Sequence, residues 1–173
     1  MKSYRLMQTR AWYGDEELTL QFPSGWEIQK IAPKDAPELT DAEIISAFQQ
    51  PIGSIGLSEM AKGKKSVAIV VDDLSRPTPA SRIIPFLLQE LSEIPKGKIC
   101  FVIGGGSHRP LTTDEISKKL GTDIAAEYQV FNHDFMSGEH RPYGNLPDGL
   151  PIYINRAVAD ADLKICLGGI YPH

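Results

Sequence analysis

A chain of 173 residues with 42% hydrophobic and 23% charged residues has the composition of a globular protein that buries one core. Its formal net charge of −4 gives no electrostatic reason to expect nucleic acid or an anionic membrane as a partner. The segment from Met1 to Gln8 has basic residues but no apolar run long enough for a signal peptide or a membrane span. We therefore expect one domain that works in the cytoplasm.

The N-terminal part, residues 11 to 31, has the pattern of an antiparallel β unit. Apolar and polar residues alternate from Leu18 to Phe22, Pro23-Ser24-Gly25 is typical of a turn, and an extended pattern resumes from Trp26 to Ile31. This pattern predicts an antiparallel β unit ahead of the rest of the chain.

Two helices are predicted next. Thr40-Asp41-Ala42-Glu43 is a capping box, with Leu39 and Ile44 placed as its hydrophobic staple, so a helix is expected to run to about Gln50. The glycine- and lysine-rich segment that follows is expected to contain one short helix, at Leu57 to Lys62.

The run from Val67 to Val71 is continuously apolar and mostly β-branched. Such a strand is buried on both faces, as in a parallel sheet with helices on either side. The run stops at Asp72, Asp73 and Arg76. Two carboxylates and a guanidinium thus lie at the carboxyl end of a buried strand, which is where ligands bind in open α/β sheets.

The helix after this strand is expected to have Thr78 as its N-cap and Pro79 at its first position. Pro85 should kink or restart this helix. Its apolar stripe is expected to consist of four residues: Ile84, Leu87, Leu88 and Leu91.

The remaining chain alternates between strand and helix patterns. Thr112 to Glu115 is a second capping box, with Leu111 and Ile116 as its staple, and the helix it opens should end at Gly121. The predicted strands are Lys98–Ile103, Tyr128–Asn132, Pro151–Asn155 and Leu163–Leu167, with a helical turn at 157–161 between the last two. This alternation predicts an α/β fold: a parallel, Rossmann-like sheet of five strands, flanked by helices.

Cys100 and Cys166 both lie in apolar, strand-like runs. This placement predicts buried free thiols in a reducing compartment. The two thiols could pair if their strands were neighbours, but no local feature indicates a disulfide.

Polar clusters follow four of the predicted strands. They are Asp72, Asp73 and Arg76; Gly104 to His108; His133 and Asp134; and Gly168 to His173.

The second cluster, Gly104-Gly105-Gly106-Ser107-His108, has the spacing of neither the dinucleotide fingerprint nor the P-loop. Its open backbone N–H groups could hold a phosphate or a carboxylate, or the glycines could simply form a tight turn. The sequence leaves both interpretations open.

The side chains of these clusters suit anion recognition and proton transfer. Arg76 could hold a carboxylate or phosphate by two hydrogen bonds, or it could form a structural ion pair with one of the aspartates. Histidine is the side chain best suited to moving a proton near neutral pH. His108 and His173 each follow a glycine-rich turn, which favours function, whereas His133 and His140 are interpreted as structural.

Three motifs together resemble the N-terminal half of the lactate racemase family, the nickel-pincer-nucleotide enzymes. They are D-D-L-S-R-P-T-P at 72–79, G-G-G-S-H-R at 104–109 and G-G-I-Y-P-H at 168–173. The resemblance implies two α/β domains with an active site between them. It also implies nickel held by a pyridinium-derived mononucleotide and an isomerase that interconverts 2-hydroxy acid stereoisomers by hydride transfer.

Residue by residue, the resemblance matches His108 and His173 to the two acid/base histidines. It matches Arg76 to the arginine that holds the substrate carboxylate and Asp73 to the aspartate of the D-x-x-R motif, also expected at the substrate. The residues expected to contact the cofactor are Gly104, Gly105, Gly106, Ser107 and Thr78.

The family's cofactor-attaching lysine and nickel-ligating histidine correspond to positions beyond residue 173, so no metal ligand is expected within this chain. We therefore expect residues 1–173 to be the N-terminal catalytic domain of a longer two-domain protein, without its C-terminal domain. By itself the chain is expected not to retain the cofactor and to be inactive. The alternatives are an anion- or nucleotide-binding module without catalysis and a structural domain without chemistry.

Overall fold

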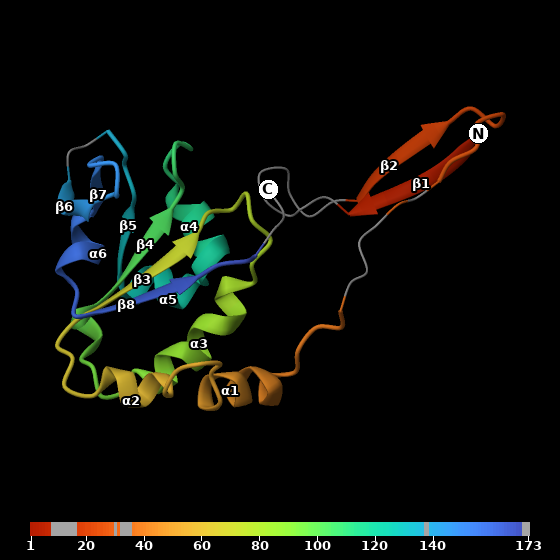
Figure 1. Cartoon of the computed structure of the whole chain (residues 1–173). Helices are drawn as coiled ribbons and strands as arrows, with labels where there is room; N and C mark the ends of the chain where they lie inside the picture. Colours follow the sequence, from red (N-terminus) through yellow and green to blue (C-terminus); the bar gives the residue numbers. More distant parts are fainter. Residues whose placement is uncertain (8–16, 30, 32–35, 137–138, 171–173) are drawn as a thin grey trace.

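A four-stranded parallel sheet forms the centre of the fold (Figure 1). The computed structural model describes residues 1–7, 17–29, 31, 36–136 and 139–170. In the order β5-β4-β3-β8, the strands are β5 (Gln129–Asn132), β4 (Ile99–Gly104), β3 (Val67–Asp72) and β8 (Leu163–Leu167). The predicted α/β class with a parallel sheet is confirmed.

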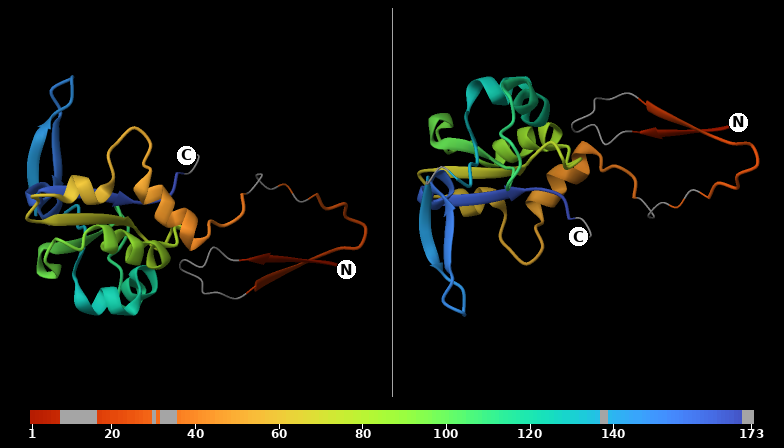
Figure 2. Two further views of the ribbon diagram at one scale, coloured as in Figure 1. Left: turned by 90° about the horizontal axis from the view of Figure 1, so that it is seen from below. Right: turned by 90° about the horizontal axis from the view of Figure 1, so that it is seen from above.

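The main core lies between one face of this sheet and the helices that cover it. Alternate residues of β3 and β4 face these helices, and they include the fully buried Ile69 and Phe101. Figure 2 shows the green and teal helices on one side of the sheet, a projecting blue hairpin on the other, and the orange helices beside the edge of the sheet. The helices are α1 (Asp41–Gln49), α2 (Leu57–Ala61), α3 (Ala80–Glu90), α4 (Thr113–Leu120) and α5 (Thr122–Glu127), with a 3-10 turn η1 (Lys96–Lys98) before β4.

Both predicted capping boxes are present. The Thr40 and Thr112 hydroxyls each accept a hydrogen bond from the backbone N–H three residues later, and the glutamates at those positions bond back to the cap. Helix α4 ends at Leu120, and its C-cap is Gly121, whose φ of 95° is costly for other residues. The first and last residues of these helices are thus determined by local sequence.

Helix α3 begins and continues differently from the prediction. Pro79 is its N-cap, and the helix begins at Ala80, so Thr78 does not cap it. The Thr78 hydroxyl donates instead to the Asp72 carboxylate at 2.5 Å. The helix also runs through Pro85, because Pro85 and Ser81 lie on the exposed side, where water can hydrate the carbonyl that lost its partner.

Two antiparallel hairpins lie outside the parallel sheet. The first pairs β1 (Lys2–Met7) with β2 (Glu17–Phe22). The predicted N-terminal antiparallel unit is therefore present, but β2 pairs with the strand before it and not with residues 26–29. Of the predicted unit, residues 11–16 and 30 lie outside the described residues.

The second hairpin pairs β6 (His140–Asn145) with β7 (Pro151–Asn155), and the short helix α6 (Arg156–Asp160) follows it. The prediction that residues 151–155 form a strand of the parallel sheet is wrong. Pro147-Asp148-Gly149 makes a tight turn, closed by the bond from the Gly149 N–H to the Leu146 carbonyl at 2.8 Å. That turn pairs β7 with its chain neighbour, so the parallel sheet has four strands.

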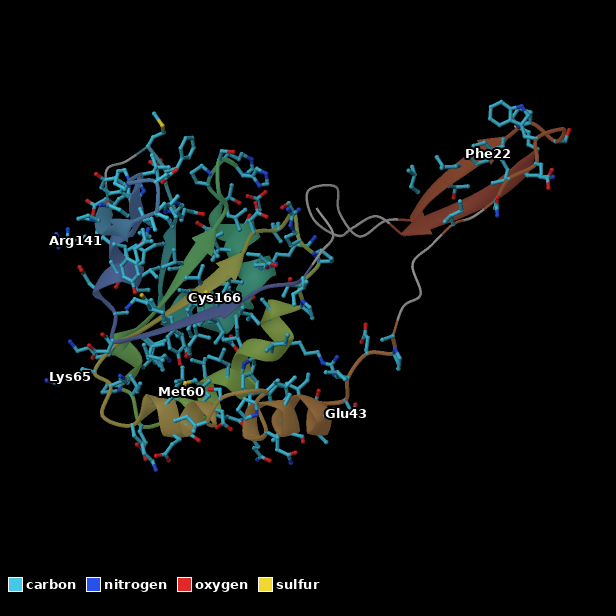
Figure 3. The ribbon with its side chains drawn as sticks, viewed as in Figure 1. Phe22, Glu43, Met60, Lys65, Arg141 and Cys166 are labelled. Atoms are coloured by element: carbon cyan, nitrogen blue, oxygen red, sulfur yellow. The ribbon has the colours of Figure 1, made fainter. Side chains whose placement is uncertain are left out.

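The two cysteines are free and lie on β4 and β8, on either side of β3, so their strands are not neighbours. Cys100 is partly buried, and burial raises the pKa of its thiol. Cys166 is exposed, which contradicts the predicted burial (Figure 3). The face of β8 that carries Cys166 is the face opposite the main helical layer.

Candidate active site

The carboxyl ends of three neighbouring strands meet at one edge of the sheet. Asp72 at the end of β3 is opposite Gly104 at the end of β4, and Val71 is opposite Leu167 of β8. The segments that follow these strands therefore emerge side by side. They carry three of the four polar clusters predicted from the sequence.

His108 and Asp73 form a hydrogen-bonded pair at this edge. The His108 Nδ1 lies 2.5 Å from the Asp73 Oδ2, while the histidine side chain remains 50% exposed. The Asp73 side chain is almost completely buried, and its Oδ1 accepts hydrogen bonds from the Ser75 hydroxyl and from the Ser75 backbone N–H at 3.0 Å. A buried carboxylate thus holds an exposed imidazole.

Burial raises the pKa of Asp73, and the hydrogen bonds from Ser75 and His108 lower it. The lowering by these hydrogen bonds is the larger effect in sum, so the pKa of Asp73 lies below its ordinary value. The carboxylate is therefore charged at neutral pH and accepts the proton on His108 Nδ1. In a neutral ring this leaves Nε2 as the nitrogen without a proton. Both Asp73 oxygens have hydrogen-bond partners within the protein.

Arg76 is exposed, and its guanidinium has no ion pair or hydrogen bond within the described part of the chain. The alternative of an Asp72–Arg76 or Asp73–Arg76 ion pair is wrong, because Lys119 and His108 take those two carboxylates. The Arg76 N–H donates to the Asp73 carbonyl at 3.2 Å, which closes the turn that carries the arginine. A planar cation that can bind a carboxylate or phosphate thus lies on the same turn as Asp73.

The glycine turn after β4 leads into His108. The His108 N–H donates to the Gly105 carbonyl at 3.0 Å, and Gly106 has a φ of 57°. A Cβ at Gly105 would lie 3.9 Å from the His108 Cβ and 4.0 Å from the Asp73 Oδ2. Gly104, Gly106 and Ser107 are exposed. The turn packs against the His108–Asp73 pair and leaves its outer side open to a ligand.

The other candidates lie elsewhere. His133, which follows β5, contacts the His140 ring of β6, with 5.3 Å between ring centroids, and the Asn155 amide of β7, so it packs against the β6–β7 hairpin. His173 lies outside the described residues. Within the described residues, no group of three or more histidine, cysteine or carboxylate side chains is placed to hold a metal ion.

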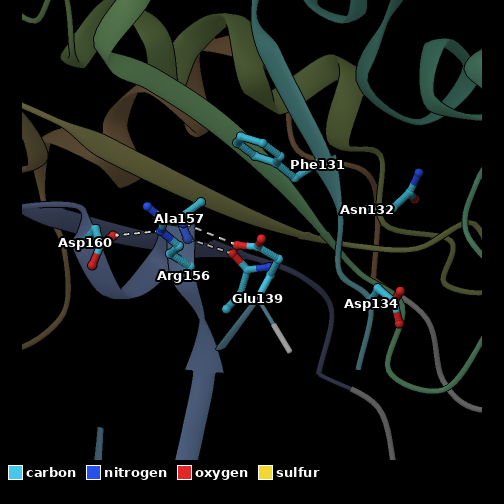
Figure 4. Close-up of a pocket in the computed structure, with 8 residues that line it drawn as sticks. Phe131, Asn132, Asp134, Glu139, Arg156, Ala157 and Asp160 are labelled. Carbon is cyan, nitrogen blue, oxygen red and sulfur yellow. Dashed lines mark hydrogen bonds and ion pairs between the residues drawn. The ribbon is translucent and has the colours of Figure 1, made fainter. Parts of the chain in front are cut away.

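A cavity of about 500 Å³ lies between β5, the start of β6 and α6, and its lining includes Asp134 but none of Asp73, Arg76 and His108 (Figure 4). Arg156 at its wall pairs with Glu139 and Asp160, each at 3.6 Å. Since this arginine is already paired with two carboxylates, the cavity is a weaker candidate for anion chemistry than the strand ends.

Lys119 is a site residue that the sequence-based prediction missed. It is 4% exposed, and its Nζ lies 2.6 Å from the Asp72 Oδ1. The signal was its position: Lys119 follows Ile116 by three residues and precedes Leu120, so helical periodicity places a charge on the apolar face of α4. A charge in such a place needs a buried partner.

Acid should weaken the fold at the start of α4. Arg109 holds both Glu115 oxygens, at 2.6 and 2.8 Å, and together with the Thr112 N–H lowers the pKa of Glu115 to about 2. The resulting stabilisation is complete above the unfolded pKa of 4.5 and is lost as pH falls toward 2. Glu115→Gln should lower the free energy of unfolding by about 1 kcal/mol at pH 7. It should also reduce the loss of this free energy between pH 4.5 and pH 2, as measured by urea unfolding across pH.

The exposed Asp114, one residue earlier, supplies the control for this prediction. Asp114→Asn should leave the stability–pH profile nearly unchanged between pH 5 and pH 2. An unaltered profile in Glu115→Gln would show that the Arg109 pair contributes nothing to folding.

Comparisons with known proteins place these residues in a family. Residues 13–173 match the model of the lactate racemase N-terminal domain. The lactate racemase of Thermoanaerobacterium thermosaccharolyticum is 32% identical over 168 residues, 93% of this chain and 39% of that protein. The lactate racemase of Lactiplantibacillus plantarum is 34% identical over 139 residues, 79% of this chain and 33% of that protein.

Solved structures agree with the sequence match. The lactate racemase apoprotein from T. thermosaccharolyticum superposes with a TM-score of 0.68 at 31% identity, covering 90% of this chain and 37% of that one. A Thermotoga maritima protein at 24% identity and a TM-score of 0.51, covering 74% of this chain and 33% of that one, shares the fold. The chain thus spans about two fifths or less of these relatives, and it belongs to the lactate racemase N-terminal domain family.

Proposed function

We propose that this chain is the N-terminal catalytic domain of a longer, two-domain, nickel-dependent racemase that interconverts 2-hydroxy acid stereoisomers. The observation that carries the proposal is the exposed His108, oriented by a charged Asp73, on strand ends that also carry Arg76, whose guanidinium has no partner among the described residues. A 2-hydroxy acid has a carboxylate for the arginine and a hydroxyl proton for the histidine.

In this proposal Arg76 binds the substrate carboxylate through two hydrogen bonds. For one enantiomer, His108 Nε2 accepts the hydroxyl proton as the carbon is oxidised, and in the opposite direction it donates a proton to the oxygen as the carbon is reduced. Asp73 holds the ring in one tautomer throughout. His173, which the structure does not describe, is proposed as the acid/base on the opposite face. The nickel-pincer nucleotide, when bound, supplies the hydride acceptor that no side chain can replace.

The described residues could bind one part of such a cofactor, its phosphate group. The exposed backbone of Gly104 to Ser107 suits an anionic phosphate, because open N–H groups at a strand end attract negative charge. The Thr78 hydroxyl is buried and bonded to Asp72, so we assign it to the support of the site. The lysine that attaches the cofactor and the histidine that ligates nickel are proposed to lie beyond residue 173 in the longer protein, together with the C-terminal domain that closes over the substrate.

The proposed surroundings are the cytoplasm, with a small 2-hydroxy acid as the partner and neither nucleic acid nor membrane. Among the described residues, no helix has both the length and the apolar composition needed to cross a bilayer.

The test is racemisation by the complete protein that carries this chain, loaded with cofactor and assayed with each lactate enantiomer and with related hydroxy acids. Turnover of a hydroxy acid in both directions is expected. The 173-residue chain given the same mature cofactor should not racemise any of these hydroxy acids, and nickel should not remain bound to it through gel filtration. Turnover by this chain alone would place the metal machinery in it and contradict the proposal.

Arg76→Lys in the complete protein should raise KM for both enantiomers by roughly tenfold or more, with a smaller effect on kcat. Lysine keeps the charge but loses the two-pronged geometry that fits a carboxylate. Steady-state kinetics in both directions measure the effect, and the exposed Arg141→Lys on the β6–β7 hairpin is the control. Unchanged constants in Arg76→Lys would remove this arginine from the substrate site.

The second candidate function is binding of a nucleotide or another anion without catalysis. It is favoured by the exposed glycine turn and the exposed Arg76, which follow neighbouring strands of the sheet. Calorimetric titration of this chain with nicotinic acid mononucleotide tests this function. Binding in the titration, together with an absence of turnover in the cofactor-loaded complete protein, would support it in place of the racemase.

A further inference from the structure

The buried Lys119 makes one ion pair and two hydrogen bonds. Its Nζ lies 2.6 Å from the Asp72 Oδ1 and donates to the Arg76 carbonyl at 3.1 Å and to the Thr78 carbonyl at 3.3 Å. The Asp72 Oδ1 is buried and accepts no hydrogen bond among the described residues, so the ion pair with Lys119 is what compensates its charge. Together these contacts offset the large cost of burying the Lys119 charge.

Asp72 extends this contact to two further segments. Its Oδ2 accepts the Thr78 hydroxyl at 2.5 Å and the Gly169 backbone N–H at 3.3 Å. The Lys119–Asp72 pair thus connects α4, the end of β3, the loop at 73–79 and the turn that follows β8. The segment at 72–79, helix α4 and the turn after β8 are far apart in the sequence, and both strand-end segments carry a site motif.

The contacts lie where they restrain the site. Lys119 holds the carbonyls on both sides of Pro77, so the backbone that carries the exposed guanidinium of Arg76 is held from within the protein. Gly169 is held relative to that same backbone through one carboxylate. The charge of the pair is buried, so it does not itself contact a ligand.

We propose that Lys119 and Asp72 are positioning residues, which set the Arg76 loop and the Gly168-Gly169 turn at a fixed spacing for one anionic ligand. The proposal rests on the proposed function only for the identity of that ligand, a 2-hydroxy carboxylate. The restraint itself follows from the contacts. A pair that served stability alone could be replaced by apolar side chains without loss of binding.

The experiment separates these two roles with a double variant. Lys119→Met alone leaves a buried carboxylate unpaired and should lower the Tm. Lys119→Met combined with Asp72→Leu removes both charges and fills the space, so the Tm should return most of the way to that of the wild type. Lys118→Met, at an exposed lysine of the same helix, is the control for the loss of a charge.

The first readout is amide hydrogen exchange of the 173-residue chain, followed by NMR, which needs no turnover. In the wild type the Gly169 amide should be protected. In the double variant it should exchange roughly tenfold faster or more, because a hydrogen bond to a charged acceptor is lost, while amides of β3 and β4 keep their protection. An unprotected Gly169 amide in the wild type would overturn the proposal without any variant.

The second readout is the kinetics of the loaded complete protein. KM for lactate should rise roughly tenfold in the double variant, with a smaller change in kcat. Racemisation with wild-type KM and wild-type Gly169 exchange in the double variant would overturn the positioning role and leave the proposed function intact. If no hydroxy acid is turned over by any form, faster Gly169 exchange would still support the restraint, while the proposed function would fail.

Discussion

Replacing His108 by glutamine in the complete, cofactor-loaded protein is expected to lower kcat for racemisation by roughly 10²–10⁴-fold, the usual contribution of one general acid/base. Glutamine can still bond to Asp73 but cannot carry a proton between substrate and solvent. Because one histidine is proposed for each face of the carbon, the two directions should be slowed unequally in pre-steady-state measurements.

The controls for His108 are drawn from the same structure. His133→Gln changes a histidine that bonds to the β6–β7 hairpin and should leave kcat close to wild type. Asp73→Asn should have a smaller effect than His108→Gln, because it disturbs the tautomer and orientation of the ring and leaves the ring in place. Wild-type turnover in His108→Gln would remove this histidine from the chemistry.

Phe101→Ala should destabilise the domain by about 3–5 kcal/mol. Phe101 lies in the middle of β4, is 0% exposed and meets the Tyr128 ring edge-on, with 5.5 Å between ring centroids. Truncation loses the transfer free energy of the ring and leaves a cavity that the paired strands on both sides cannot close. With a total stability of about 5–15 kcal/mol for an ordinary domain, this loss removes a large share.

Urea unfolding followed by circular dichroism measures this change. Phe135→Ala is the matched control, because Phe135 is 52% exposed and its truncation should cost well under 1 kcal/mol. A cost below about 1 kcal/mol for Phe101→Ala would mean that the packing between β4 and the helices does not hold the domain together.

The sequence predicted best what depends on neighbouring residues. The capping boxes at Thr40 and Thr112, and the apolar runs of β3, β4 and β8, correspond to the observed elements because caps and buried strands use local chemistry. The strand at Pro151–Asn155 was assigned to the wrong sheet because pairing depends on topology, and the local turn at Pro147 to Gly149 was given no weight.

The sequence predicted which residues lie at the site better than it predicted which residues they contact. Arg76, Asp73 and His108 do lie on neighbouring strand ends, but the sequence could not show that His108 takes Asp73 while Lys119 takes Asp72. Adjacent residues on an extended strand point to opposite faces, which predicted that the two aspartates have separate partners without naming them. The partner of Asp72 comes from a helix more than forty positions later, and periodicity alone gave the hint.

The strand order affects how the chain can fold while the ribosome synthesises it. The central strand β3 pairs on one side with β4 and on the other with β8, whose Leu163 is opposite Val67 although it is synthesised about 96 residues later. At a synthesis rate of roughly 5–20 residues per second, one edge of β3 stays without its partner strand for on the order of 5–20 s. During that interval an apolar strand presents unpaired N–H and C=O groups, so the nascent chain is most exposed to mispairing, and most dependent on chaperones, before β8 emerges.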